Sequence, residues 1–262
     1  MAKRNKITLS LLFASSLLIV CGGSVLATIA YLNGSKVQPI MDWGKMSVQE
    51  QESFVRNVEF ANEILDRRSV AATFAEVENS YKSLATGSDS ELFYGKKEAR
   101  YVVTEYSDIE CPACRFYYPF TKQLVDKYSD KVALNFKYYP LPFHDPAATD
   151  ETVAAICMGK IKGKAAEFAF VDQLFSDTRS NGEGSELLDK IPKAIGIDQK
   201  KYLKCLKDPH IQEIIAGYKA AGDKDQISGT PTLIFTDTVT GNKLTAGGGN
   251  LEQLEQYLKK LF

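Results

Sequence analysis

The two cysteines of the run Cys111-Pro112-Ala113-Cys114 are the residues of this 262-residue sequence best suited to chemistry. The run follows a β-branched and aromatic stretch at 101–106, which predicts a strand, and it precedes a helical pattern. Pro112 fits the first helical position, where its missing N–H is not needed. Cys111 then lies at the helix N-terminus, where free N–H groups and the helix dipole favour a thiolate. The motif predicts thiol–disulfide exchange, with Cys111 as the nucleophile and Cys114 as the resolving thiol.

A CxxC pair can also belong to a zinc site or form a static structural disulfide. Zinc needs four ligands, which normally include a second closely spaced pair. The cysteines at 157 and 205 are far apart in the sequence, and neither of the two histidines has a neighbouring ligand. We therefore expect no metal and no cofactor. A static disulfide remains the simpler alternative to redox chemistry.

Composition and charge limit the class of protein. Hydrophobic residues make up 44% of the chain and charged residues 25%, as in soluble globular domains. The 32 Lys and Arg residues nearly balance the 33 Asp and Glu residues, so the net charge of -1 indicates no nucleic-acid partner. This composition also excludes a disordered protein, a collagen-like fibre and a multi-spanning membrane protein.

The N-terminus carries an uncharged apolar run, residues 7–32, directly after three basic residues. The run is long enough for a bilayer core, which about 20 helical residues span, and longer than the usual secretory signal of about 7–15 residues. We predict a single-pass transmembrane signal anchor at 1–33 in the inner (cytoplasmic) membrane, with the remainder in the periplasm or outside, because basic flanks stay cytoplasmic. Cleavage near 24–28, which would release the chain to the periplasm, and a lipoprotein at Cys21 are the alternatives.

Residues 34–93 are predicted to form a linker and a helical spacer. Ser47 and Glu50 have the spacing of a capping box, so we expect a helix from about 47 to 84, bent or interrupted at 67–69. Two short apolar stripes follow the box and are out of phase with each other. They indicate either packing on the chain's own catalytic domain or pairing with another subunit, and we keep a homo-oligomer as an alternative.

The rest of the chain has the element order of an α/β domain. Strand patterns alternate with helical ones, and a long stretch of helical composition separates the second predicted strand from the third. The predicted strands are 101–106, 131–139, 232–235 and 243–246, the helical stretch is 145–222, and a last amphipathic helix covers 251–261.

The order of strand, CPxC helix, helical insertion and a Gly-Thr-Pro-Thr-Leu run at 229–233 resembles the DsbA-like branch of the thioredoxin-fold proteins. The resemblance covers 94–262, with the insertion at about 145–222. It implies a thioredoxin-like α/β fold with an inserted helical subdomain. It also implies a cis Pro231 that faces the active cysteines, and a Thr230 backbone that hydrogen-bonds a bound substrate chain as a strand would.

The same resemblance implies roles for residues outside the CxxC motif. Glu105 matches a buried acidic residue beneath the active site, whose role would be proton exchange with Cys114; a solvent-facing Glu105 is the alternative. His144 lies in a loop that enters the insertion and is expected to hold that loop rather than to titrate. Cys157 and Cys205 match cysteines that some relatives join as a second, structural disulfide, and two buried free thiols are the alternative.

The family resemblance implies a protein thiol–disulfide oxidoreductase that acts on exported proteins and passes electrons to a membrane redox partner. The sequence leaves two alternatives, a reductase or isomerase that acts as an oligomer and a binding module with a static disulfide. The dipeptide between the cysteines tunes the potential through the stability of the thiolate. Pro112-Ala113 lacks the histidine of strongly oxidising relatives, which argues against a strong oxidant.

Overall fold

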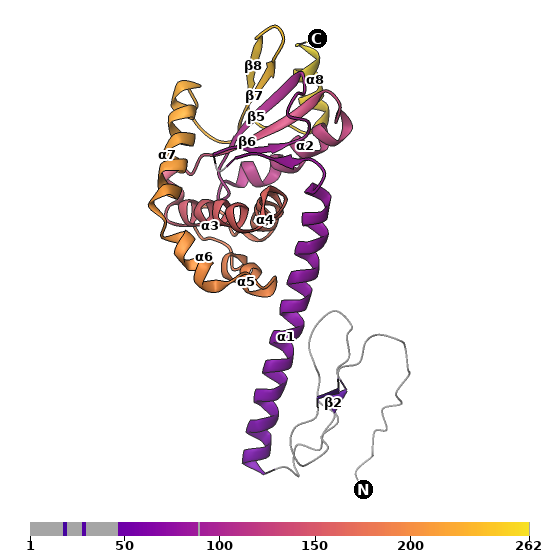
Figure 1. Ribbon diagram of the computed structural model, residues 1–262, viewed down its shortest axis with the longest axis vertical. Coiled ribbons are helices and arrows are strands. Elements are labelled where there is room, and N and C mark those ends of the chain that lie inside the picture. Colours follow the sequence, from indigo (N-terminus) through magenta and orange to yellow (C-terminus); the bar gives the residue numbers. More distant parts are fainter. Residues whose placement is uncertain (1–17, 20–27, 30–46, 89, 262) are drawn as a thin grey trace. The chain divides into compact units, whose positions relative to one another are not determined.

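The structure is a computed structural model that describes residues 18–19, 28–29, 47–88 and 90–261 (Figure 1). The chain divides into two units, Met1–Ser69 and Val70–Phe262. In the first unit, strand β1 (Leu18–Ile19) pairs antiparallel with strand β2 (Thr28–Ile29). These two short strands are the described part of the N-terminal segment.

The predicted anchor at 1–33 otherwise lies outside the described residues, and so does the predicted linker up to residue 46. Within the described ranges, no helix has both the length and the apolar character that a membrane crossing requires. The first unit is therefore described mainly by the start of a long helix.

Helix α1 (Val48–Tyr81) begins at the predicted capping box. The Glu50 N–H donates to the Ser47 hydroxyl at 3.3 Å, and the Ser47 N–H donates to the Glu50 carboxylate at 2.8 Å. The helix is continuous across 67–69, so the predicted interruption there is wrong. Neither glycine nor proline occurs between Val48 and Tyr81, and no residue in this stretch breaks a helix.

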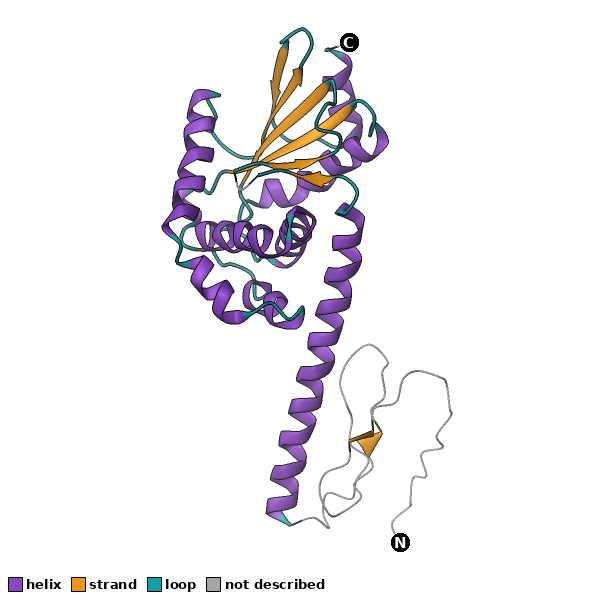
Figure 2. Cartoon of the chain, in the orientation of Figure 1, coloured by secondary structure: helices purple, strands orange, loops and turns teal. Residues whose placement is uncertain are grey.

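The second unit contains one six-stranded sheet, in the order β3-β4-β6-β5-β7-β8 (Figure 2). β5 lies inside the sheet, parallel to β6 and antiparallel to β7. Four of these strands were predicted, whereas the short β3 and most of β4 lie in the stretch 34–93 that the sequence predicts to be a linker and a helical spacer. The strands are β3 (Ala85–Thr86), β4 (Leu92–Tyr94), β5 (Tyr101–Ser107), β6 (Val132–Tyr138), β7 (Thr232–Asp237) and β8 (Lys243–Ala246).

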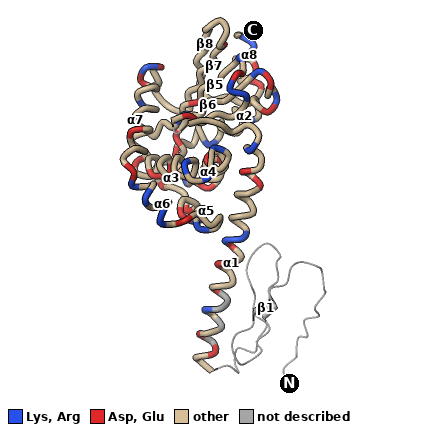
Figure 3. The backbone as a smooth tube through the Cα atoms, in the orientation of Figure 1, with Lys and Arg blue, Asp and Glu red and all other residues tan. Residues whose placement is uncertain are grey.

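Helices cover the sheet and form the predicted insertion between β6 and β7 (Figure 1). α2 packs on β6 and on α8, and α7 also contacts β6. Charges of both signs are interspersed along the helices of the insertion (Figure 3). The helices are α2 (Pro112–Lys127), the short 3-10 helix η2 (Pro142–His144), α3 (Ala147–Lys162), α4 (Lys164–Asp177), α5 (Leu187–Ala194), α6 (Gln199–Leu206), α7 (Pro209–Lys224) and α8 (Leu251–Lys259).

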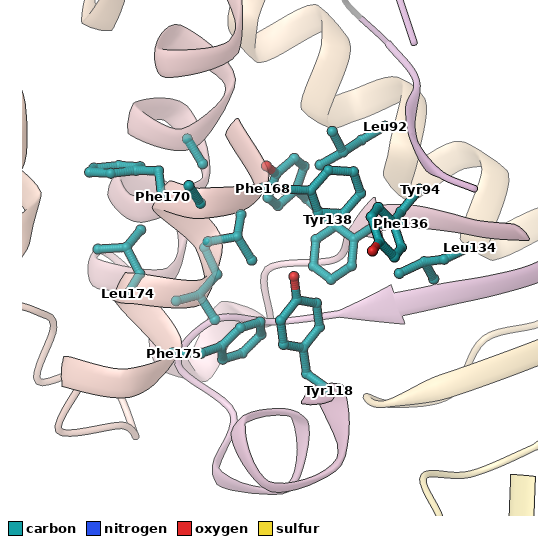
Figure 4. Close-up of a cluster of buried hydrophobic side chains, with 14 of the residues drawn as sticks. Leu92, Tyr94, Tyr118, Leu134, Phe136, Tyr138, Phe168, Phe170, Leu174 and Phe175 are labelled. Carbon is teal, nitrogen blue, oxygen red and sulfur yellow. The ribbon is translucent and has the colours of Figure 1, made fainter. Parts of the chain in front are cut away.

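A buried aromatic cluster joins the sheet, α2 and α4 (Figure 4). Tyr118 of α2 lies edge-on to Phe136 of β6, with ring centroids 5.6 Å apart, and tilted against Phe175 of α4 at 4.8 Å. Each buried side chain of this size stabilises the fold by roughly 1.5–3 kcal/mol. The cluster therefore fixes the helical insertion against the sheet that carries the CxxC motif.

The second unit starts earlier than the predicted domain boundary at 94. Phe74 and Tyr81 of α1 are 1% exposed and belong to the core, and Tyr81 stacks on Phe168 with ring centroids 5.0 Å apart. The end of α1 and strands β3 and β4 are thus part of the catalytic domain rather than of a spacer. The second apolar stripe predicted on this helix therefore faces the domain core.

Cys157 of α3 and Cys205 of α6 form a disulfide, with their Cα atoms 5.8 Å apart. The bond closes a loop with a sequence separation of 48 residues within the insertion. In the chain-entropy account, a cross-link of this span stabilises the folded state by restricting the unfolded chain. The disulfide accordingly ties together the two halves of the insertion.

Replacing both Cys157 and Cys205 by alanine is expected to lower the free energy of unfolding by roughly 2–4 kcal/mol, since the loop constraint is lost. Urea unfolding of the oxidised parent and of the double variant measures the difference. Reductant also reduces the Cys111–Cys114 pair of both proteins, so its effect on the unfolding midpoint of the double variant is the reference, and the midpoint of the parent should fall relative to that reference. Equal stability of the two oxidised proteins would contradict a structural role for the bond.

Candidate active site

The CxxC motif lies at the junction that the sequence predicts, between strand β5 and helix α2. Cys111 is the N-cap residue of α2, with the extended backbone angles φ -82° and ψ 119°, and Pro112 occupies the first turn. The Arg115 N–H donates to the carbonyl of Cys111 at 3.0 Å, the first hydrogen bond of the helix. The N–H groups of the first turn therefore remain free to stabilise negative charge at Cys111.

The two cysteines differ sharply in access to solvent. Both are reduced; Cys111 is 7% exposed, whereas Cys114 is fully buried. Pro112 and Ala113 between them are exposed. A substrate sulfur atom can therefore reach Cys111 but not Cys114. Cys111 is the reactive thiol and Cys114 the resolving one.

The electrostatic surroundings separate the two thiols further. The pKa of Cys111 is lowered to about 5, first by a hydrogen bond from the Cys114 thiol and then by the backbone N–H groups of Cys114 and Ala113. The pKa of Cys114 is raised well above its ordinary value, chiefly by burial and then by the neighbouring Cys111. At neutral pH the pair thus holds one thiolate, at the accessible position, and one thiol.

The second motif of the sequence meets the first at Cys111. The Cys111 Sγ atom lies 3.4 Å from the carbonyl oxygen of Thr230, although the two residues are 119 positions apart. The Thr230–Pro231 peptide bond is cis. The structure therefore brings the backbone of Thr230 and Pro231 beside the reactive sulfur, where a chain bound to that sulfur would pass.

Glu105 is buried in strand β5, so the solvent-facing alternative is wrong. Its side chain is 1% exposed, and neither carboxyl oxygen has a hydrogen-bond partner among the described residues. Burial raises the pKa of Glu105 to about 7. Ser107, two residues further on the same face of β5, lies close to both the Glu105 carboxyl and the Cys114 thiol. A carboxyl that titrates near neutrality thus shares the neighbour Ser107 with the Cys114 thiol.

The sequence analysis did not single out Asp108, which organises the loop before Cys111. Its buried carboxylate accepts hydrogen bonds from the Glu110 N–H at 2.8 Å and the Leu141 N–H at 2.9 Å. Its Oδ2 atom also lies 2.7 Å from Nδ1 of His144, which holds the loop of η2 as expected. The available signal was an acidic residue placed directly between a buried strand and the motif.

No cluster of three or more His, Cys, Asp and Glu side chains suited to a metal ion occurs in the part of the chain that the structure describes. The reactive groups that the described site presents are the two sulfur atoms, the Glu105 carboxyl and the surrounding backbone. Together they are equipped for transfer of a disulfide and its two protons.

Comparison with known proteins agrees with this arrangement. Residues 87–260 match the family model described as thioredoxin. The crystal structure of Pseudomonas aeruginosa DsbA2 is 31% identical, with a TM-score of 0.58, and the match covers 65% of this chain and 93% of that one. The chain belongs to the DsbA-like branch of the thioredoxin family.

More distant relatives share the DsbA-like fold or part of the sequence. A Rickettsia felis protein, provisionally named a protein-disulfide oxidoreductase, is 26% identical over 158 residues, which are 59% of this chain and 56% of that protein. This DsbA-like chain thus spans little more than half the length of such relatives. Wolbachia pipientis alpha-DsbA1 has the same fold, with a TM-score of 0.55, 19% identity and coverage of 70% of this chain and 95% of that one.

Proposed function

We propose that this chain is a protein thiol–disulfide oxidoreductase that exchanges disulfides with exported proteins through Cys111 and Cys114. The observation that carries the proposal is the asymmetry of the pair, an accessible thiolate at a helix N-cap above a buried thiol. Family membership and the names of the relatives support the same activity.

The exchange proceeds in two sulfur transfers. When the pair is oxidised, a substrate thiolate attacks Cys111, the Cys111–Cys114 bond breaks, and Cys114 leaves with the electron pair and takes up a proton. A second substrate thiolate then attacks the mixed disulfide, so that the substrate leaves oxidised and Cys111 departs as a thiolate. The same steps in reverse reduce or isomerise a substrate. A membrane redox partner would accept or donate the two electrons.

The location proposed for this activity is outside the cytoplasm, with the chain held at the inner membrane by the segment 1–33. The apolar run 7–32 and the basic residues before it support this proposal. Release to the periplasm after cleavage is the alternative. Either location is oxidising enough for the Cys157–Cys205 disulfide to persist.

The second candidate is an isomerase or reductase that works as an oligomer. The observation in its favour is the exposure of large apolar side chains on α1 within the first unit. Val48 is 70% exposed, Val55 41% and Phe60 63%, and the first two lie seven positions apart, as in a heptad. Sedimentation of the exported part, residues 40–262, distinguishes a monomer from an oligomer.

Titration of the redox pair against glutathione tests the proposed function. A reversible equilibrium is expected, and a reduction potential near the value of about -270 mV known for thioredoxin would favour the reductase. Replacing Cys114 by alanine should trap substrates as mixed disulfides at Cys111. A pair that does not equilibrate with glutathione and traps no substrate would contradict the proposal and favour a binding module with a static disulfide.

A further inference from the structure

The two residues that flank the CxxC motif are bound to the same stretch of the helical insertion. We call this stretch, residues 176–184 from the end of α4 into the loop before α5, the clamp segment. Arg115, directly after Cys114, donates to the carbonyl of Thr178 at 2.7 Å and to the carbonyl of Ser176 at 3.0 Å. One side of the motif is thereby attached to the end of α4.

Glu110, directly before Cys111, makes the larger set of contacts with the clamp segment. Its fully buried carboxylate accepts hydrogen bonds from the Thr178 hydroxyl and from the N–H groups of Gly182 at 2.7 Å and Gly184 at 3.1 Å. Its backbone carbonyl accepts from the Asn181 N–H at 2.8 Å. A carboxylate that accepts with both oxygens is held in one orientation.

The backbone of the clamp segment has an unusual conformation that this carboxylate supports. Ser180 and Asn181 have φ angles of 65° and 58°, and Gly182 and Gly184 have φ angles of 88° and 72°. Left-handed backbone costs energy at the two non-glycine positions, and it turns neighbouring N–H groups toward a common anion. The segment is therefore shaped around the Glu110 side chain.

A cavity and a buried carboxyl adjoin this part of the clamp segment. A cavity of about 330 Å³ borders Gly182 and Gly184, and Glu151 of α3 also lines it. Glu151 is 1% exposed, and its pKa is raised to about 9, chiefly by burial and then by the charge of Glu110. Glu151 is thus neutral at neutral pH and does not repel Glu110. Glu110 thus keeps its hydrogen bonds to the glycine turn without repulsion from Glu151.

We propose that Glu110 and Arg115 are positioning residues through which the clamp segment fixes the first turn of α2 around Cys111. The helical insertion would then set the stability of the Cys111 thiolate, and so the redox potential, without contacting a substrate. This inference rests on the proposed thiol–disulfide exchange. It extends that proposal by assigning control of the redox potential to the buried contact between Glu110 and the clamp segment.

A positioning role and a direct charge effect predict opposite results for Glu110→Gln. Loss of a nearby negative charge alone would stabilise the thiolate and lower the pKa of Cys111. Loss of the clamp would misalign the N–H groups that stabilise the thiolate, and so raise the pKa of Cys111. We expect a rise of roughly one unit, which corresponds to a tenfold shift of the glutathione equilibrium toward the disulfide.

Thr178→Val provides a second variant without any change of charge. It removes the hydroxyl that donates to Glu110 and that accepts from the Ser180 N–H at 2.9 Å. The matched control is Glu183→Gln, in the same segment, whose side chain is 68% exposed and pairs only loosely with Arg179 at 3.9 Å. The control should keep the potential and thiolate pKa of the parent.

The experiment measures thiolate absorbance against pH and the glutathione equilibrium of full-length parent and variants, with circular dichroism as a check of folding. In this equilibrium, two glutathione thiols reduce the Cys111–Cys114 disulfide and leave as one glutathione disulfide. A raised pKa in Glu110→Gln and Thr178→Val, but not in Glu183→Gln, supports the inference. An unchanged or lowered pKa in folded Thr178→Val overturns it. A parent that fails to equilibrate with glutathione overturns the proposed function instead.

Discussion

Replacing Cys111 by serine is expected to reduce the rate of disulfide exchange by more than roughly a thousandfold. A serine hydroxyl is not ionised at neutral pH and forms no mixed disulfide, whereas the Cys111 thiolate is favoured by its position at the N-cap. Exchange is measured in two ways for the parent and the variant. The first is the oxidation of a reduced, unfolded test protein by one equivalent of the oxidised enzyme, and the second is the catalysed oxidation of the same test protein in glutathione buffer.

The matched variant Cys114→Ser should fail in a different way. Its accessible thiolate still attacks a substrate that carries a disulfide, so that a mixed disulfide forms and one substrate sulfur leaves as a thiolate, but no second thiol resolves the mixed disulfide and the covalent complex accumulates. Alkylation of the reduced parent at different pH values separately tests the pKa of Cys111. Since the pKa of Cys111 is about 5, the alkylation rate should be level above about pH 6 and fall below pH 5. Equal residual activity in the Cys111 and Cys114 variants would contradict the division of roles.

The parts of the site that depend on neighbouring residues could be predicted from the sequence. A β-branched run, a proline at the first helical position and a CxxC spacing are local signals, and they placed Cys111 at the N-cap of α2 correctly. The contact between Cys111 and Thr230 spans 119 residues, and only the family resemblance indicated it. Pairing between distant strands determines this contact, and periodicity within one segment carries no information about it.

The residues that sequence reasoning missed act through loops and through the ends of elements. Asp108 binds the Leu141 N–H in the loop after β6, and Glu110 binds a loop with left-handed residues at 180–182 and 184; no hydrophobic pattern reveals either contact. Strand β4 has only three residues, too few for a periodic signal, and the end of α1 is part of the domain core through Tyr81. Tertiary packing decided these features, and so the domain starts at Val70 rather than at 94.

Burial of Glu105 has a cost that depends on pH. Its pKa of about 7 in the folded chain exceeds the ordinary value of 4.5, so the folded state prefers the neutral form. The stability that this group contributes is therefore complete below pH 4.5 and is lost as the pH rises through 7. Glutamine keeps the shape and cannot ionise, so it removes this loss.

Glu105→Gln is accordingly expected to be more stable than the parent at pH 8, by an amount on the order of 2–3 kcal/mol, and nearly equal to it at pH 4.5. Urea unfolding at a series of pH values measures the difference. Glu98→Gln, at an exposed position just before β5, is the matched control and should follow the parent. A parallel pH dependence of Glu105→Gln and parent would contradict a raised pKa at Glu105.

Glu105→Gln should also slow the exchange reaction, although it stabilises the fold. Cys114 takes up a proton when it leaves the disulfide and gives one up when it attacks. Ser107 lies close to both that buried sulfur and the Glu105 carboxyl. Loss of a proton acceptor that titrates near neutrality costs roughly a hundredfold in the resolving step. Stopped-flow decay of the mixed disulfide at pH 7 measures this step. If Glu105→Gln is more stable than the parent but resolves the mixed disulfide equally fast, Glu105 affects stability alone and takes no part in the proton exchange.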